Sequence, residues 1–358
     1  MGRFILKSTV FVSPFLLVLF IELFILPIDH FTFRVWEALS VGEFRNILPG
    51  PFYPNQEITK AEKGDIGHHF DFAVKREARW VTDRYGYRKK DTHVRRHPIV
   101  IVGDSNITGS GLTQEEILSE VLEKQLKASV YPYAPVRSIN NFLKDKRFIE
   151  SCPETLIFAS IERDLLRLSA LKEPKDRKWA SQWMQIMNQN RRIQNVIVLL
   201  DRLSKLNMLH FLRASLRRCF GSPSINLFAK APSPYGQMLF LQGAKASREV
   251  SKEILDRTIG IILSYHDIIR TRGSRFIFVP IPEKENIFHE LLETRRPVFL
   301  EELITKLKEK GVETLDTQKA FEEAYRKNKT LLYQTEDAHW NANGVRVTAE
   351  LIGKAIKK

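Results

Sequence analysis

A chain of 358 residues, 43% hydrophobic and 27% charged, is long enough to bury a sizeable core, and this composition excludes a disordered or fibrous protein. The formal net charge of +14 predicts an anionic partner: nucleic acid, lipid headgroups or an acidic polysaccharide. Because the chain has no zinc-finger spacing, RNA-binding aromatic motif or compact basic arm, we expect no nucleic acid partner.

The first predicted element is an apolar segment over residues 8–28, broken only by two prolines and Glu22. As a helix it would be about 30 Å long, enough to cross the hydrocarbon core of a bilayer. Arg3 and Lys7 precede it, which favours a cytoplasmic N-terminus and export of the remainder. We therefore predict a membrane anchor over residues 1–29. The rest of the chain would lie outside the cytoplasm, in the periplasm or the extracellular space of a bacterial-type cell.

Two other interpretations of this segment stay open. A cleaved signal peptide would need a small-x-small cleavage site, whereas the segment is long and ends in Leu26-Pro27-Ile28-Asp29. A buried core helix would have to bury Glu22 and begin at the chain terminus.

Residues 30–96 are predicted to form a juxtamembrane lead-in that packs on the domain after it. Three prolines between residues 49 and 54 favour an extended connector, and residues 83–88 carry turn signals without a clear period.

Regular alternation of strands and helices begins near residue 97. The predicted strands are 98–102, 129–133, 155–160, 275–281, 312–315 and 331–333. Predicted helices follow a capping box of Thr113 with Glu116, occupy the region 285–310, and run from about Asn341 to the end. This order predicts an α/β domain over 97–358, a flavodoxin-like parallel sheet with helices on both faces.

A mostly helical insertion is predicted at about residues 165–272. Its centre, residues 196–220, interleaves leucines with arginines and lysines. One interpretation is a helix packed on the core with a solvated basic face, and the other is contact with an anionic membrane surface or acidic glycan. The chain has two cysteines, Cys152 and Cys219. Export would permit a bridge between them, but we expect two unrelated buried thiols.

The first chemical signal is Gly103-Asp104-Ser105-Asn106, where the first buried strand ends and a helix is about to begin. Sites in open α/β sheets form at such carboxyl ends, where a serine can expose its hydroxyl beside backbone N–H groups. Taken alone, the segment is also typical of an ordinary turn with a helix-capping serine.

The second signal is Asp337-Ala338-His339-Trp340-Asn341, between the last predicted strand and the last helix. A serine hydroxyl needs a base to accept its proton, and histidine suits that role near neutral pH. A carboxylate then orients the imidazole and stabilises its protonated form. Asp337 and His339 supply both groups from one loop.

Together these two blocks resemble the SGNH/GDSL hydrolase superfamily, and most closely the SGNH-like domain of alginate and related polysaccharide O-acetyltransferases. Segments 82–88 and 278–284 look similar as well, so that the resemblance spans about residues 75–355. It implies an SGNH-type fold in which Ser105 is the nucleophile, His339 the general base and Asp337 its orienting partner.

The chain departs from the family pattern at the oxyanion-binding positions. Generic members place a glycine after the second strand and Gly-x-Asn-Asp after the third, whereas residues 133–135 here read Tyr-Ala-Pro and residues 160–164 Ser-Ile-Glu-Arg-Asp. The Ser105 N–H is the best oxyanion donor, with Asn140, Asn141 and Arg163 as further oxyanion or substrate-binding candidates. Arg163 could bind a substrate carboxylate or pair with Glu162.

Two further features have mainly structural interpretations. Asp65, His68, His69 and Asp71 could ligate a metal but form no closed ligand set, so a solvated turn is favoured. Lys284 could meet an acidic substrate, although an exposed loop lysine is the default. We predict no metal and no cofactor.

The function favoured by the resemblance is an extracytoplasmic O-acyltransferase that acetylates an exported polysaccharide through an acyl-serine. The enzyme would have a single membrane span, and a multi-span acyltransferase is its expected partner. An esterase or deacetylase with the same triad is the first alternative, since acceptor choice depends on exclusion of water. A non-catalytic polysaccharide assembly protein on the same scaffold is the second.

Overall fold

The computed structural model describes residues 2–68, 70–91, 94, 96–172, 190–220, 229–233, 235–241 and 249–357. Side chains are described for these residues except at positions 214, 217–220, 229 and 328. His69 and the side chain of Cys219 therefore lie outside the described part of the chain.

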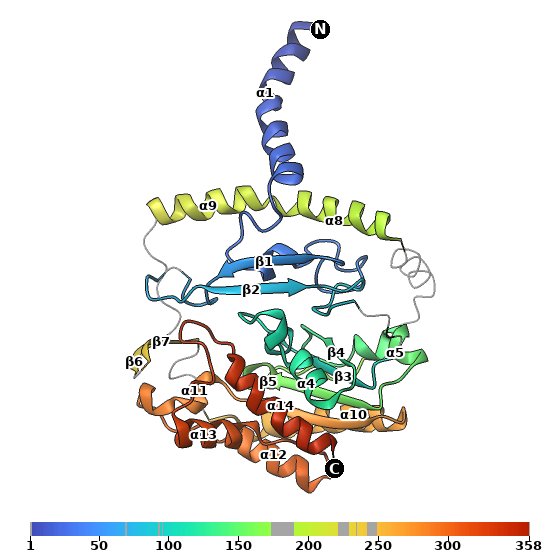
Figure 1. Cartoon of the computed structure of the whole chain (residues 1–358), viewed down its shortest axis with the longest axis vertical. Helices are drawn as coiled ribbons and strands as arrows, with labels where there is room; N and C mark the ends of the chain where they lie inside the picture. The colour runs from blue at the N-terminus through green and yellow to red at the C-terminus, as the bar shows by residue number, and fades with distance from the viewer. Residues whose placement is uncertain are drawn as a thin grey trace.

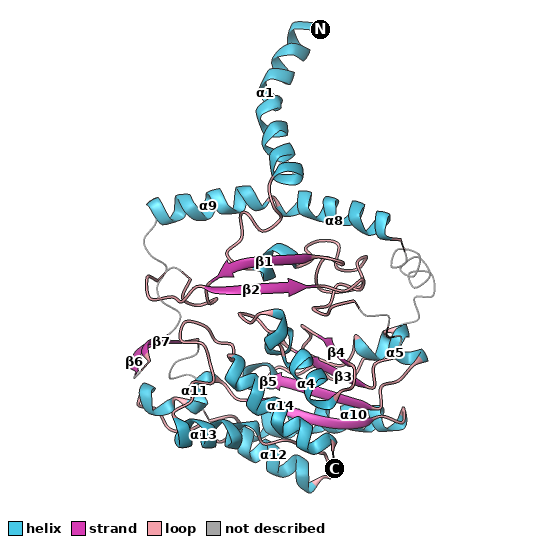
Figure 2. Ribbon diagram, in the orientation of Figure 1, coloured by secondary structure: helices cyan, strands magenta, loops and turns pink. Residues whose placement is uncertain are grey.

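The centre of the protein is a four-stranded sheet in the order β4-β3-β5-β8, with all strands parallel. Its strands are β3 (Ile99–Gly103), β4 (Val130–Tyr133), β5 (Thr155–Ile161) and β8 (Arg275–Ile281). Every residue of β3, β4 and β5 is buried, as expected for apolar strands covered on both faces. Four of the predicted strands are thus confirmed, and Figures 1 and 2 show the sheet below the β1–β2 pair.

Helices cover both faces of this sheet, which confirms the predicted fold class. One core cluster joins β3 and β8 to Leu118 and Leu122 of α4 (Leu118–Leu126) and to residues of α13 (Thr317–Asn328) and α14 (Ala342–Ile356). The other joins the opposite face to α5 (Lys146–Glu150), α10 (Lys252–Thr271) and α12 (Phe299–Glu309). The predicted capping box of Thr113 and Glu116 is present and precedes α4. Shorter helices are α3 (Ser105–Thr108), α6 (Glu162–Leu165), α11 (Lys284–Ile287) and the 3₁₀ turns Gln114–Glu116, Phe142–Lys144 and His289–Leu292.

Two predicted strands and one predicted helix were wrong in detail. Residues 312–315 form only a single parallel bridge, between Thr314 and Phe278. Residues 331–333 form only a single antiparallel bridge, between Tyr333 and Trp340, and Asn341, which caps α14, binds the carbonyls of all three. The region 285–310 is not one helix, since Pro297 disfavours helical backbone at the residue before it.

The lead-in contains regular structure that we did not predict. Strands β1 (Glu57–Glu62) and β2 (Arg76–Val81) pair antiparallel, and α2 (Val35–Leu39) packs against them. Trp80 and Phe52 are fully buried there, and Ile197 of α8 (Arg191–Lys205) closes the cluster from the far side. The strands escaped detection because the two apolar residues of β1, Ile58 and Ala61, are three positions apart, which gives no apolar alternation.

Arg88 joins the lead-in to the α/β domain. Its guanidinium lies 3.9 Å from the ring centroid of Trp80 and donates to Gly109 O at 2.6 Å and Leu112 O at 2.7 Å. Burial lowers the pKa of Arg88 to about 9. A cation buried in this way is stabilised only by such a full set of acceptors, so Arg88 holds the loop after Ser105 against the lead-in.

The region between β5 and β8 contains more than a helical insertion. Residues 196–220 belong to two helices, α8 and α9 (Asn207–Phe220), because Leu206 between them adopts left-handed backbone with φ 46°. A hairpin of β6 (Ala229–Ser233) and β7 (Gly236–Phe240) follows, and α10 is the crossover helix that returns to the sheet. Cys152 is a half-buried free thiol.

The N-terminal helix stands apart from the rest of the molecule (Figure 1). Helix α1 (Gly2–Phe20) continues as one π-helical turn, Ile21–Ile25, to give a helix of 24 residues whose most apolar stretch has a mean hydropathy of 2.3 and is only 6% buried. This exposure is incompatible with a buried core helix. A membrane anchor and a signal sequence both satisfy these properties.

Candidate active site

Ser105 is held at the carboxyl end of β3 by the residue before it. One carboxylate oxygen of Asp104 accepts from the backbone N–H of Asn106 at 2.8 Å and caps α3, and the other accepts from the N–H of Ile161 at 2.6 Å. Asp104 thus ties the turn after β3 to the end of β5. Gly103 is required there, because a Cβ would come within 2.7 Å of Ala159 O.

The structure brings Ser105, His339 and Asp337 together. Ser105 Oγ lies 2.8 Å from His339 Nε2, and His339 Nδ1 lies 2.5 Å from Asp337 Oδ1. Asp337 is completely buried and His339 is 5% exposed. The serine hydroxyl can therefore donate to one imidazole nitrogen while the other donates to the carboxylate, the arrangement needed to remove the serine proton.

Asn106 and Trp340 fix the distance between the two loops. The Asn106 side-chain oxygen accepts from Trp340 N at 3.3 Å, and its backbone carbonyl accepts from the indole Nε1 at 3.2 Å. Both residues are fully buried. Trp340 follows His339 directly, so this double contact sets where the imidazole stands relative to Ser105.

We expect Trp340→Phe to lower activity about 10-fold or more while the protein remains folded, because losing the indole N–H removes one of the two donors to the Asn106 carbonyl, the one that ties it to the His339 loop. The measurement is the rate of acetyl-ester hydrolysis beside circular dichroism. A matched control is Trp36→Phe, in the lead-in core away from the triad. Equal rates for the Trp340 variant and the wild type would contradict this role.

Lys284 corrects our sequence interpretation, since it is neither an exposed loop residue nor a substrate contact. Its side chain is 1% exposed. The ammonium donates to the carbonyls of Leu239, Gln334, Thr335 and Asp337 at 2.5–3.2 Å. Lys284 thereby fastens the loop that carries Asp337 and His339 to β7 and to the end of β8.

The lead-in also makes backbone hydrogen bonds to this loop, which the sequence did not predict. The Asp65 N–H donates to Asp337 Oδ2 at 3.0 Å, and Gly67 N–H donates to Glu336 O at 3.0 Å. At Gly64 and Gly67 a Cβ would come within 2.5–2.6 Å of Glu336. The two glycines bracketing Asp65 were the available signal for this close backbone approach.

Asp65 also places a second carboxylate beside the imidazole. Its Oδ2 lies 3.8 Å from His339 Nδ1 and 3.6 Å from Arg34 Nη1. The Arg34 guanidinium in turn donates to Ser110 Oγ at 3.3 Å, in the loop after α3. Arg34 and Asp65 therefore place two further charged groups beside the triad.

The electrostatics of the site follow from burial and these neighbours. Burial alone would lower the pKa of His339, but the carboxylates of Asp337 and Asp65 outweigh it and raise that pKa above its ordinary value. Burial would raise the pKa of Asp337, yet the His339 imidazole holds it well below its usual range. Burial, followed by repulsion from Asp337, raises the pKa of Asp65 to about 6.

We expect Asp65→Asn to move the acidic limb of the pH–rate profile to lower pH. Only a neutral imidazole can accept the Ser105 proton, and removal of a negative charge 3.8 Å away makes the imidazolium less stable, so His339 loses its proton at lower pH. Arg34 and Asp337, the other charged groups facing Asp65, remain in place. The exposed Asp71 of the same segment provides the control Asp71→Asn, for which no displacement is expected. A displacement to higher pH would contradict this role.

The three oxyanion or substrate candidates are not joined to the triad by any hydrogen bond or ion pair in the described residues. The amide of Asn140 is occupied with the backbone of Ala170 and Lys172. Asn141 is exposed and lines a separate groove. Arg163 pairs with Glu283, where we had considered Glu162.

The acidic and histidine residues considered as metal ligands separate in the structure. His68 stacks on Phe33 with ring centroids 4.2 Å apart, and Asp71 is exposed. Asp65 instead joins Asp337 and His339 in a group whose ligand atoms lie within 4.8 Å of one another. In the triad arrangement His339 Nδ1 donates to Asp337, which leaves that nitrogen no lone pair for a cation.

A parallel sheet is covered by helices, and a serine, a histidine and an aspartate are joined in series at one end of it, which is the arrangement that α/β serine hydrolases use. Residues 237–358 match the family model described as SGNH hydrolase-like domain, acetyltransferase AlgX. This confirms the resemblance for the second sequence block: the last third of the chain is similar to an SGNH hydrolase-like domain. The matched range contains Asp337 and His339, whereas Ser105 is placed by the geometry alone.

Solved structures give weaker similarities. A lipolytic protein of the G-D-S-L family from Desulfitobacterium hafniense DCB-2 is 12% identical over 72% of this chain and 97% of that one, with a TM-score of 0.37. The acetyl xylan esterase AlAXEase is 11% identical over 72% of this chain and 98% of that one, also at 0.37. At such scores these similarities add nothing to the assignment. No curated protein matches the chain.

Proposed function

We propose that this protein is an extracytoplasmic, serine-dependent O-acyltransferase that acetylates an exported polysaccharide. The single observation that carries the proposal is the continuous contact from Ser105 through His339 to Asp337 in a chain whose last third matches an acetyltransferase family model. Helix α1 supports membrane attachment of the exported domain, where a multi-span partner could deliver the acyl group.

The reaction proceeds in two balanced steps. Ser105 Oγ attacks the acetyl carbonyl carbon of the donor ester while His339 Nε2 accepts the hydroxyl proton, and the imidazolium returns that proton to the leaving alcohol. A sugar hydroxyl then attacks the acetyl-serine, giving its proton to His339, which restores it to Ser105. Asp337 stays ionised throughout and stabilises the imidazolium in each step.

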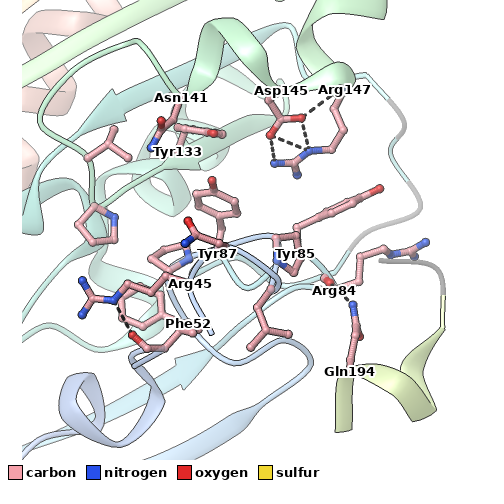
Figure 3. Close-up of a pocket in the computed structure, with 18 of the residues that line it drawn as sticks. Arg45, Phe52, Arg84, Tyr85, Tyr87, Tyr133, Asn141, Asp145, Arg147 and Gln194 are labelled. Atoms are coloured by element: carbon pink, nitrogen blue, oxygen red, sulfur yellow. Dashed lines mark hydrogen bonds and ion pairs between the residues drawn. The ribbon is translucent and has the colours of Figure 1, made fainter. Parts of the chain in front are cut away.

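A groove between the lead-in and the α/β domain is our candidate for the acceptor chain (Figure 3). It has a volume of about 1200 Å³. Its labelled walls are Tyr133, Asn141, Asp145 and Arg147 on one side and Arg45, Phe52, Arg84 and Tyr85 on the other. Aromatic faces beside amide and guanidinium donors suit the apolar faces and hydroxyl groups of sugars. One of its lining residues, Val136, donates its N–H to Gly103 O at 2.6 Å, two positions before Ser105, although Ser105 and His339 themselves do not line the groove.

The test is a competition between transfer and hydrolysis. The full chain is incubated with an aryl acetate donor, with and without acetyl-free oligosaccharides, and acetylated sugar and free acetate are both quantified. We expect acetylated sugar to form faster than acetate at saturating acceptor. Release of acetate alone, unaffected by any acceptor tried, would assign the protein to the esterases and overturn the transferase proposal.

A further inference from the structure

Helix α8 presents one face inward and leaves another uncovered, and the described side chains of α9 are exposed or half-buried. Gln194, Ile197 and Asp201 form the inner face of α8, where Asp201 accepts from Gly42 N at 2.8 Å and from the Tyr53 hydroxyl at 2.7 Å. The outer side carries exposed large apolar side chains, which are Val196, Leu200 and Leu203 on α8 and Leu209, Phe211, Leu212 and Leu216 on α9. We call these seven residues the outer stripe. They are 39–57% exposed.

The outer stripe lies where the apolar N-terminal helix leaves the domain. Figure 1 shows α8 and α9 crosswise at the base of α1, with the β1–β2 sheet on their other side. Because Ile197 and Asp201 of α8 face the lead-in, its exposed apolar side chains face the side on which α1 extends.

The junction is fixed by specific contacts. Glu22, at the end of the apolar segment, is 7% exposed, and its carboxylate accepts from the N–H of Met208 at 3.3 Å, in the first turn of α9. Arg202 of α8 donates to the Glu22 carbonyl at 2.9 Å. Phe31, just after the apolar segment, packs on Phe211 with ring centroids 5.6 Å apart. The break between α8 and α9 at Leu206 therefore sits against the end of the helix that would span the membrane.

The charge of this helix pair is strongly positive. Residues 191–220 contain seven arginines and lysines and a single acidic residue, Asp201, which is buried against the lead-in. Arg191, Arg192 and Arg213 are exposed. An amphipathic helix with leucines on one side and flanking arginines, and without exposed acids, has the composition of helices that lie in the interface of anionic membranes.

We propose that α8 and α9 lie on the outer surface of the bilayer that α1 spans, with the outer stripe inserted among anionic phospholipids. The pair then forms a platform that holds the α/β domain at a set height and orientation above the membrane. Contact with the bilayer covers the outer stripe, which would otherwise be exposed to solvent beside a membrane span. This inference rests on α1 as a membrane span and is independent of the acyl-transfer reaction.

The test measures lipid contact residue by residue in the full chain. In a Cys152→Ser, Cys219→Ser background, the single variants Leu200→Cys, Leu212→Cys, Leu16→Cys and Lys354→Cys are each labelled with an environment-sensitive fluorophore. The proteins are reconstituted in phosphatidylcholine vesicles with or without phosphatidylglycerol, and quenching by acyl-chain nitroxide lipids is recorded. Leu16 lies in α1 and reports the span, whereas the exposed Lys354 lies in α14 and reports solvent.

We expect labels at Leu200 and Leu212 to shift to shorter wavelength and to be quenched several-fold more than the label at Lys354 when phosphatidylglycerol is present. Quenching at Leu16 with Leu200 and Leu212 indistinguishable from Lys354 would overturn the platform while leaving the anchor intact. Absence of quenching at Leu16 would overturn both. Equal quenching at Leu212 in the two lipid mixtures would refute the contribution of charge. The double variant Arg192→Gln, Arg213→Gln tests the contribution of charge separately.

Discussion

Ser105→Ala is expected to abolish the acetyl-enzyme and to reduce turnover of an aryl acetate by about 10³-fold or more, because no other hydroxyl in the described residues contacts the His339 imidazole. The measurements are the intact mass of the protein after brief exposure to donor and the steady-state rate. His339→Ala should cost about as much, and the double variant little more, since the two side chains act as one unit.

The control for this experiment is Ser119→Ala. Ser119 is fully buried in α4, and its hydroxyl has no hydrogen-bond partner in the described structure, so its loss should change neither stability nor rate appreciably. Retention of the acetyl-enzyme in Ser105→Ala would show that the nucleophile lies elsewhere and would remove the basis of the proposed mechanism.

Lys284→Met is expected to destabilise the protein by about 3 kcal/mol or more and to depress activity together with stability. Four carbonyls that now share one buried ammonium would lose their donor, and one of them belongs to Asp337. Chemical denaturation monitored by circular dichroism measures the change in the free energy of unfolding. The exposed Lys308→Met serves as the control. A variant within about 1 kcal/mol of wild type would contradict the role assigned to Lys284.

The same residue predicts a pH dependence of stability. Burial lowers the pKa of Lys284 to about 7, whereas in the unfolded chain it is near its ordinary value of about 10.4. Between these values the unfolded chain binds more protons than the folded one, so the contribution of Lys284 to the free energy of unfolding rises with pH across that range. Below about pH 7 both states hold the proton, and the contribution stays at its lowest value. Lys284→Met should remove this part of the pH dependence.

Local patterns in the sequence were sufficient for the central elements. Continuous apolar runs predicted β3, β4, β5 and β8, and Asn341 marked the start of α14. The Gly-Asp-Ser-Asn and Asp-x-His-Trp blocks selected the three side chains that the structure brings into contact, because each block carries its chemistry within a few residues. The first block directly follows β3, which places Ser105 at the carboxyl edge of the sheet.

Only the tertiary structure decided what surrounds these three side chains. Lys284 looked like a loop lysine, and its role depends on carbonyls 45–53 residues away. Asp65 looked like part of a solvated turn, and its neighbours His339 and Asp337 lie more than 270 positions further along the chain. Sequence periodicity reports which face of an element is buried, but it carries no information on which distant carbonyl or carboxylate will face a given polar side chain. The support of the site is made of such long-range polar contacts, whereas the strands and the motifs they carry are specified locally.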